Sequence, residues 1–191
     1  MNPAELDAIR RRIQRAFAAV RFASGSGYEV SYQANGTDFT TNFTAIGIKA
    51  PEQLEDDFLN LFVWIWSLKD YLKSCFESKG LQAKAVEDEA SSCKALAYVS
   101  DIANKAKHGE LRKSRSGEFA ELVNVGFNAP DECIERIVFS GLDVTLLIKD
   151  PQMIIIHATV ATQSGGRYDA LAVLTEAMDC WESNVLSQIE A

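Results

Sequence analysis

Residues 101–115, DIANKAKHGELRKSR, contain the side chains of this chain that are best suited to chemistry on an anion. The segment includes His108, one of two histidines in the sequence, and five of the 19 lysine and arginine residues. A histidine can act as a general acid or base near neutral pH, and a nearby cation can stabilise the charge on a strained phosphate. The segment therefore indicates either binding of a phosphate-bearing partner or acid–base chemistry at His108.

The spacing of the polar residues places them on one side of a helix. Asp101, Asn104 and His108 are separated by three and then four positions, which corresponds to successive turns of an α-helix. We therefore expect an exposed binding face with His108 as the candidate catalytic residue, and the binding residues are Asp101, Asn104, Lys105, Lys107 and Arg112. The alternative is a solvated helix face on which His108 only interacts with the negative end of the helix dipole.

Two short motifs carry a family resemblance. The first is Leu68-Lys69-Asp70-Tyr71-Leu72, and the second is Asp101-x-x-Asn104-x-x-Lys107-His108. Together they resemble the LRDWL…DxxNxxKH pattern of uncharacterised bacterial HEPN-like proteins, which are four-helix bundles and usually dimers. The resemblance covers residues 52–111, and it implies a homodimer in which Asp70 has a supporting role at the site.

The same resemblance implies two kinds of function. Many HEPN proteins are metal-independent ribonucleases of toxin–antitoxin or antiviral systems, with an arginine five to seven positions before a histidine. His108 matches that histidine, but residues 101–104 contain no arginine, so Lys107 or Arg112 would have to supply the cation. The resemblance therefore favours binding of a nucleotide, RNA or an antitoxin-like protein, without a cofactor. A ribonuclease that uses His108 is the alternative.

The cysteines give no metal-binding pattern. The four of them lie far apart in the sequence, at Cys75, Cys93, Cys133 and Cys180. No CxxC pair is present and histidines are scarce, so the sequence predicts no zinc site. We expect all four thiols to be reduced and buried in a cytoplasmic protein, because no apolar leader and no membrane-spanning stretch is visible.

An aromatic segment offers a third interpretation. Residues 28–48 are rich in Thr, Tyr and Phe and contain Asn35-Gly36, which is typical of a two-residue turn in a β-hairpin. A small-ligand binding module could use the predicted sheet together with the aromatic residues of segment 28–43.

Hydrophobic periodicity predicts the elements that would position these residues. An apolar residue recurs every three or four positions in four segments, which we expect to be helices: 3–22, 51–79, 84–108 and 167–189. Segments rich in Val and Ile, separated by turn signals, are expected to be strands: 118–127, 135–149 and 152–163. The prediction is a mainly helical α+β fold. It is a single four-helix bundle-like domain over residues 1–191, with a small three-stranded antiparallel sheet inserted before the last helix.

The charge distribution restricts the partners. A net charge of −8 over 191 residues argues against a protein that coats nucleic acid with its whole surface. The positive charge is nevertheless clustered, with five cationic residues in 1–21 and five in 105–115. Local binding of an anionic partner at these segments remains compatible with the composition.

The helix predicted over residues 51–79 should bring two chains together. Its middle, 58–68, is apolar nearly all the way round, so a small bundle would leave part of it exposed unless a second copy covers it. We expect light scattering at micromolar concentrations to give the mass of a dimer. A monomeric mass across that range would contradict the expectation.

Overall fold

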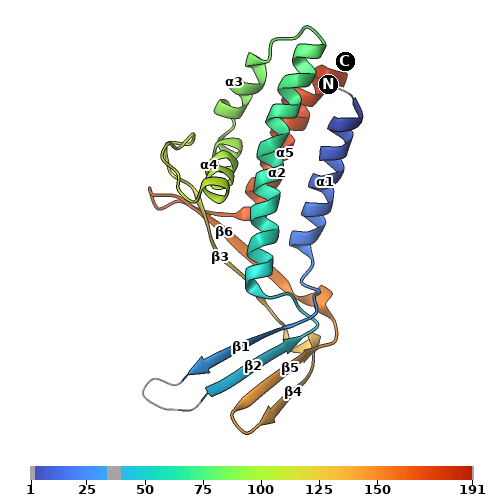
Figure 1. Cartoon of the computed structure of the whole chain (residues 1–191), viewed down its shortest axis with the longest axis vertical. Helices are drawn as coiled ribbons and strands as arrows, with labels where there is room; N and C mark the ends of the chain where they lie inside the picture. Colours follow the sequence, from blue (N-terminus) through green and yellow to red (C-terminus); the bar gives the residue numbers. More distant parts are fainter. Residues whose placement is uncertain (1–2, 34–39, 191) are drawn as a thin grey trace. The chain divides into compact units, whose positions relative to one another are not determined.

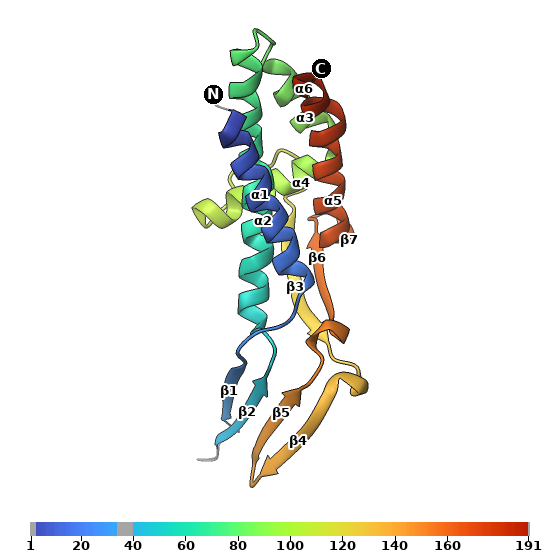
Figure 2. The same cartoon turned by 90° about the vertical axis from the view of Figure 1, so that its right-hand side faces the viewer.

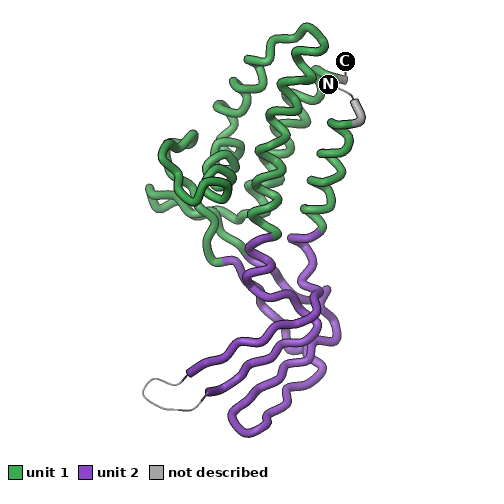
Figure 3. Tube along the Cα trace, viewed as in Figure 1, with its two compact units in different colours: residues 1–18, 57–124, 158–191 green, residues 19–56, 125–157 purple. Residues whose placement is uncertain are grey.

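The computed structural model describes residues 3–33 and 40–190 and has an α+β fold (Figure 1). The chain divides into two compact units, which Figure 3 shows in different colours. Unit 1 comprises residues 1–18, 57–124 and 158–191, and unit 2 comprises residues 19–56 and 125–157. The single domain over 1–191 therefore stays a prediction. Over the described ranges, no helix has the length and apolar character needed to cross a membrane.

The first two helices agree with the expected ranges. Helix α1 spans Pro3–Arg21 and helix α2 spans Pro51–Ser78. The two helices run side by side in Figures 1 and 2, and the Arg12 guanidinium lies 5.0 Å from the centre of the Trp64 ring. Apolar periodicity predicts these two ranges correctly because each helix buries a continuous stripe of side chains. In α1 this stripe includes Ile9 and Ile13.

The third predicted helix is two helices. Helix α3 spans Lys84–Ser92 and helix α4 spans Lys94–His108, with Cys93 between them in an extended conformation (φ −80°, ψ 113°). The N–H of Cys93 still donates to the carbonyl of Glu89 at 3.0 Å, so the chain turns at Cys93 without losing that bond. Helix α4 ends as expected at Gly109, whose left-handed conformation (φ 78°) favours glycine.

The last predicted helix begins later than expected. Strand β7, Arg167–Asp169, comes first, and the Asp169 carboxylate then caps helix α5, Ala170–Trp181, by accepting from the N–H of Ala172 at 2.7 Å. A π-helical turn, Glu182–Leu186, and the short helix α6, Ser187–Glu190, follow. Trp181 is fully buried, and its indole N–H donates to the carbonyl of Ile65 in α2 at 3.2 Å.

Unit 2 contains a four-stranded mixed sheet with the order β1-β2-β5-β4 (Figure 2). Strands β1, Tyr28–Gln33, and β2, Thr40–Ile46, are antiparallel, which confirms the predicted hairpin; its Asn35-Gly36 turn lies outside the described residues. Strand β5, Asp143–Ile148, pairs in parallel with β2 and antiparallel with β4, Ile134–Ser140. The unit packs around a core of five buried residues: Ala23, Ala45, Ile48, Cys133 and Ile154.

The predicted three-stranded antiparallel sheet is present, but its strands are not the three that were expected. The expected central strand, 135–149, contains a turn at Gly141 (φ 66°), so it forms the hairpin of β4 and β5 instead. Strands β3, Glu121–Asn128, and β6, Ile155–Ala161, belong to a separate sheet with the order β3-β6-β7. Two 3₁₀ turns, Asp131–Cys133 and Pro151–Met153, precede β4 and β6. Strand pairing over such separations depends on tertiary contacts that local periodicity does not contain.

The expectation of four reduced cysteines is also wrong. Cys93 and Cys180 form a disulfide, with their Cα atoms 6.7 Å apart, that joins the α3–α4 junction to α5. Cys75 and Cys133 are buried, as expected, and do not belong to this disulfide. Burial raises the pKa of the Cys75 and Cys133 thiols, which suits inert core residues.

Reduction of this disulfide should destabilise the protein. The bond links residues 87 positions apart, and closing a loop of that size restricts the unfolded chain enough to contribute about 2–4 kcal/mol to the free energy of unfolding. We expect the free energy of unfolding to fall by this amount when a dithiol is added. The measurement is urea denaturation with a metal chelator present. The Cys93→Ser/Cys180→Ser variant should be insensitive to the dithiol, and an unchanged wild type would contradict the expectation.

Candidate functional site

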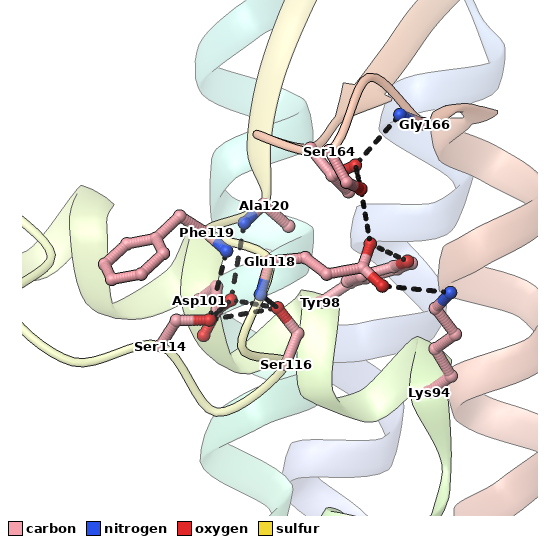
Figure 4. A network of polar contacts seen from close by, with 11 residues as sticks. Lys94, Tyr98, Asp101, Ser114, Ser116, Glu118, Phe119, Ala120, Ser164 and Gly166 are labelled. Carbon is pink, nitrogen blue, oxygen red and sulfur yellow. Dashed lines mark hydrogen bonds and ion pairs between the residues drawn. The ribbon is translucent and has the colours of Figure 1, made fainter.

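Asp101, predicted to lie on the exposed binding face, is completely buried. One carboxylate oxygen accepts from the hydroxyls of Ser114 and Ser116, both at 2.6 Å, and from the N–H of Ala120 at 3.3 Å (Figure 4). The other oxygen accepts from the N–H of Arg115 at 2.7 Å. The prediction of an exposed Asp101 is therefore wrong, because the loop that follows α4 folds back over this side of the helix.

Segment 114–120 is arranged around this carboxylate. The two serine hydroxyls that donate to Asp101 also accept backbone N–H groups: Ser114 from Phe119 at 3.1 Å and Ser116 from Glu118 at 3.0 Å. Phe119 adopts a left-handed conformation (φ 47°), which side chains other than glycine rarely take. A buried carboxylate without hydrogen-bond donors would destabilise the fold. All four donors to Asp101 come from segment 114–120, so the segment has to follow a path that brings them to this carboxylate.

A second polar cluster anchors the same loop. The Glu118 carboxylate accepts from the Tyr98 hydroxyl at 2.9 Å and from Ser164 at 3.4 Å, and it forms an ion pair with Lys94 at 3.3 Å (Figure 4). Burial, with hydrogen bonds to Tyr168 and Glu118, raises the pKa of Tyr98 to about 12. Tyr98 therefore stays protonated at physiological pH and keeps donating to Glu118.

His108 and Asn104 occupy the surface that the sequence predicted for them. Asn104 is half-buried, with its amide nitrogen 3.4 Å from the Ser100 hydroxyl, and His108 is exposed on the last turn of α4. A cavity of about 510 Å³ brings residues of α4 together with the loop that follows; its lining residues are Asn104, His108, Glu110, Leu111, Arg112 and Lys113. Polar and cationic groups thus converge at one place on unit 1.

The remaining predicted residues lie around this cavity or away from it. Arg112 is exposed and forms an ion pair with Glu110 at 2.6 Å. Lys107 donates to the Ser67 hydroxyl of α2 at 3.3 Å, and Asp70 is exposed on α2. Lys105 pairs with Glu121 at 2.5 Å, and both residues line a different cavity. The structure therefore brings together Asn104, His108 and Arg112, but not Lys105.

A neighbouring cavity contains cationic and aromatic residues that sequence reasoning did not identify. It has a volume of about 620 Å³ and shares Asn104 and Lys113 with the first cavity. Trp66 lies in it, with Lys69 4.6 Å and Arg115 4.9 Å from the centre of its ring. Such cation–π contacts fix the two cations beside an aromatic surface. No sequence pattern indicates this arrangement, because Trp66 and Arg115 belong to segments that are far apart along the chain.

Glu87 partly neutralises this second group of cations. Its carboxylate lies 3.1 Å from Lys69, 3.0 Å from Lys73 and 3.2 Å from Arg115. Burial alone would raise the pKa of Glu87, but hydrogen bonds from Lys73 and Lys69 and their charges lower it to about 2. Glu87 is therefore ionised at neutral pH and pairs with all three cations, and Lys73 also interacts with the charges of Asp70 and Glu77.

Aromatic residues of segment 28–43, which could form a small-ligand site, take part in the packing of unit 2. The rings of Tyr28 and Phe43 lie 6.2 Å apart and pack against the core of unit 2. Residues 34–39 of that segment lie outside the described residues. Packing on a core accounts for these two aromatic side chains without a ligand.

The chain matches no protein-family model, no curated protein and no solved structure. The likeness to HEPN-like proteins therefore rests on the two motifs in α2 and α4 alone. Of the second motif, Asn104, Lys107 and His108 lie at the surface of α4, whereas Asp101 is buried beneath the loop.

Replacing the buried carboxylate should destabilise the protein far more than replacing an exposed one. Asp101→Ala leaves two hydroxyls and two N–H groups without an acceptor, at about 1–3 kcal/mol for each group that stays unsatisfied. We expect the free energy of unfolding, measured by urea denaturation, to fall by about 3 kcal/mol or more.

The exposed carboxylate of Asp70 is the matched control, and Asp70→Ala should change stability by no more than about 0.5 kcal/mol. His108→Ala should be equally mild because His108 is exposed. Equal losses of stability for Asp101→Ala and Asp70→Ala would show that the Asp101 network does not stabilise the fold.

Proposed function

We propose that this protein binds single-stranded RNA at the surface formed by the end of α4 and the loop after it. Asn104, His108, Arg112 and Lys113 would contact the strand. One observation carries the proposal: a single cavity of about 510 Å³ is lined by two cationic side chains of the loop together with an amide and an imidazole of α4, and by one carboxylate, Glu110, which pairs with Arg112. Arginine and lysine are suited to phosphates, while amide and imidazole groups can hydrogen-bond to bases or to the ribose 2′-hydroxyl.

The charge distribution supports this choice. The chain carries a net charge of −8, so a phosphate backbone is repelled by most of its surface. The cations of the first cavity and those around Trp66 lie at neighbouring cavities that share Asn104 and Lys113. A strand bound at the first cavity would find Lys69 and Arg115 beside it, and these two cations are held by the ring of Trp66, which is only 8% exposed.

The buried network supports the proposal through preorganisation. Arg112 and Lys113 immediately precede Ser114, which is held by Asp101 at 2.6 Å. A loop that is already fixed loses less conformational entropy on binding than a free loop. In this proposal Asp101 positions the binding loop and does not contact RNA.

The two motifs in α2 and α4 support a proposal for the fold family and the oligomeric state. We propose that the helices form a HEPN-like four-helix bundle and that two copies associate into a dimer. A nucleotide or an antitoxin-like protein that presents acidic groups would be recognised by the same surface, and competition with RNA would reveal either one.

A ribonuclease is the second candidate, and one observation favours it: His108 and Arg112 line the same cavity. In such a reaction His108 would accept the proton of the ribose 2′-hydroxyl as its oxygen attacks phosphorus, and Arg112 would stabilise the charge of the pentacoordinate phosphate. The P–O5′ bond would then break, and water would protonate the departing 5′-oxygen. The arginine follows the histidine by four positions here, whereas it precedes the histidine in the family motif. Arg112 would also have to exchange its ion pair with Glu110 for the phosphate.

Removal of the loop cations should weaken RNA binding. We expect Arg112→Ala/Lys113→Ala to lower the affinity for a fluorescently labelled single-stranded RNA at least about tenfold, measured by anisotropy at low salt. The slope of log K against log salt should fall by about 0.7 for each phosphate that no longer pairs with a cation of the protein. Lys84→Ala is the matched control, because Lys84 is exposed on α3 and lines neither cavity.

Equal weakening by Lys84→Ala, or no salt-dependent binding by the wild type, would refute the binding site. The same samples test the second candidate. Cleavage of the RNA by the wild type and not by His108→Ala, compared at RNA concentrations that saturate both proteins, would establish the ribonuclease, and intact RNA in both would leave binding alone.

A further inference from the structure

Three metal-ligating side chains converge on unit 1, and none of them lines the proposed RNA surface. They are Glu89, Cys93 and Cys180, whose ligand atoms all lie within 4.8 Å of one another. Glu89 and Cys93 are one helical turn apart at the end of α3, so their side chains project from the same side. Cys180 comes from α5 and forms the disulfide with Cys93. Two cysteine sulfurs and a carboxylate from two separate segments thus share one small volume.

The carboxylate is oriented by a neighbour. The side-chain amide of Asn184, in the π-helical turn after α5, donates to one oxygen of Glu89 at 2.9 Å. Hydrogen bonds of this kind fix the direction of a metal-binding carboxylate and are a common feature of metal sites in proteins.

We propose that Glu89, Cys93 and Cys180 bind a thiophilic divalent cation such as Zn²⁺ when the disulfide is reduced. Thiolate and carboxylate groups are usual zinc ligands, at about 2.3 Å from the metal for sulfur and about 2.0–2.2 Å for oxygen. Tetrahedral geometry then places ligand atoms roughly 3.5–3.8 Å apart. Groups that already lie within 4.8 Å of one another reach that arrangement with small side-chain rotations.

The carboxylate of this group lies beside a solvent-accessible cavity. A cavity of about 540 Å³ borders Glu89; it is lined mainly by polar residues, which include Asp88, Ser92, Asn184 and Gln188. Glu89 and Cys180 are both half-buried, so neither a reductant nor an ion has to cross the core. The fourth coordination position would be filled by water from the cavity, as in zinc sites with three protein ligands.

The oxidation state controls the site. A dithiol reductant breaks the bond between the two sulfurs, is itself oxidised to a disulfide, and leaves two thiols on the protein. Binding of Zn²⁺ then displaces one proton from each thiol, so two protons are released for each ion bound. In the oxidised protein neither sulfur is a thiolate, and the carboxylate alone is a weak ligand. The site therefore exists only in the reduced protein.

The first experiment compares two states of the same chain, so no variant has to fold. The protein is reduced with a dithiol, the reductant is removed under nitrogen, and Co²⁺ is added as a spectroscopic probe. We expect one Co²⁺ per chain with the near-ultraviolet charge-transfer band of thiolate coordination, and its displacement by one equivalent of Zn²⁺. The oxidised protein should show no such band. Absence of the band in the reduced protein, or equal uptake by both states, would overturn the proposal.

Variants then test each ligand. Cys93→Ser and Cys180→Ser should each abolish the charge-transfer band or reduce it to that of a single thiolate, and Glu89→Gln should weaken Zn²⁺ binding at least about tenfold. Asp88→Asn is the matched control, because Asp88 borders the same cavity but is not one of the three ligands. Equal weakening by Asp88→Asn and Glu89→Gln would show that the cavity attracts cations without a defined site. These residues are separate from the proposed RNA surface, so failure of RNA binding leaves this test unaffected.

Discussion

A carboxylate that is fully removed from water has to be supplied with hydrogen-bond donors, and Asp101 obtains its four donors from the loop that follows α4. Two of them are serine hydroxyls that in turn accept backbone N–H groups, so the path of segment 114–120 is fixed by one side chain. This constraint also determines where Arg112 and Lys113 lie, because they enter the loop directly before Ser114. The candidate RNA surface therefore depends on a residue that does not belong to it.

The disulfide between Cys93 and Cys180 organises the other end of the same helix. Cys93 leaves the helical conformation at the α3–α4 junction, and its partner lies one residue before the buried Trp181. The end of α5 is thus tied covalently to the start of α4 and packed against α2 through the indole group. In the proposed reduced state a metal ion would replace the covalent bond and keep the two segments together, with Glu89 as an additional ligand.

The electrostatics explain how an acidic chain can present a local site for an anion. Lys69, Lys73 and Arg115 surround the carboxylate of Glu87, which is ionised at neutral pH. In the proposed function these cations attract the phosphate backbone locally, although the chain as a whole carries a net charge of −8. The uneven distribution of charge matters more for such a protein than its net charge.

Features that depend on neighbours along the chain could be predicted from the amino-acid sequence. The ranges of α1 and α2, the end of α4 at Gly109, the hairpin of β1 and β2, and the exposed position of His108 follow from periodicity, caps and turn residues. The parallel pairing of β2 with β5, the disulfide and the burial of Asp101 became visible only in three dimensions. A helical pattern shows which residues share a face. It does not show that a later loop covers that face, because the contact forms between segments whose separation along the chain carries no periodic signal.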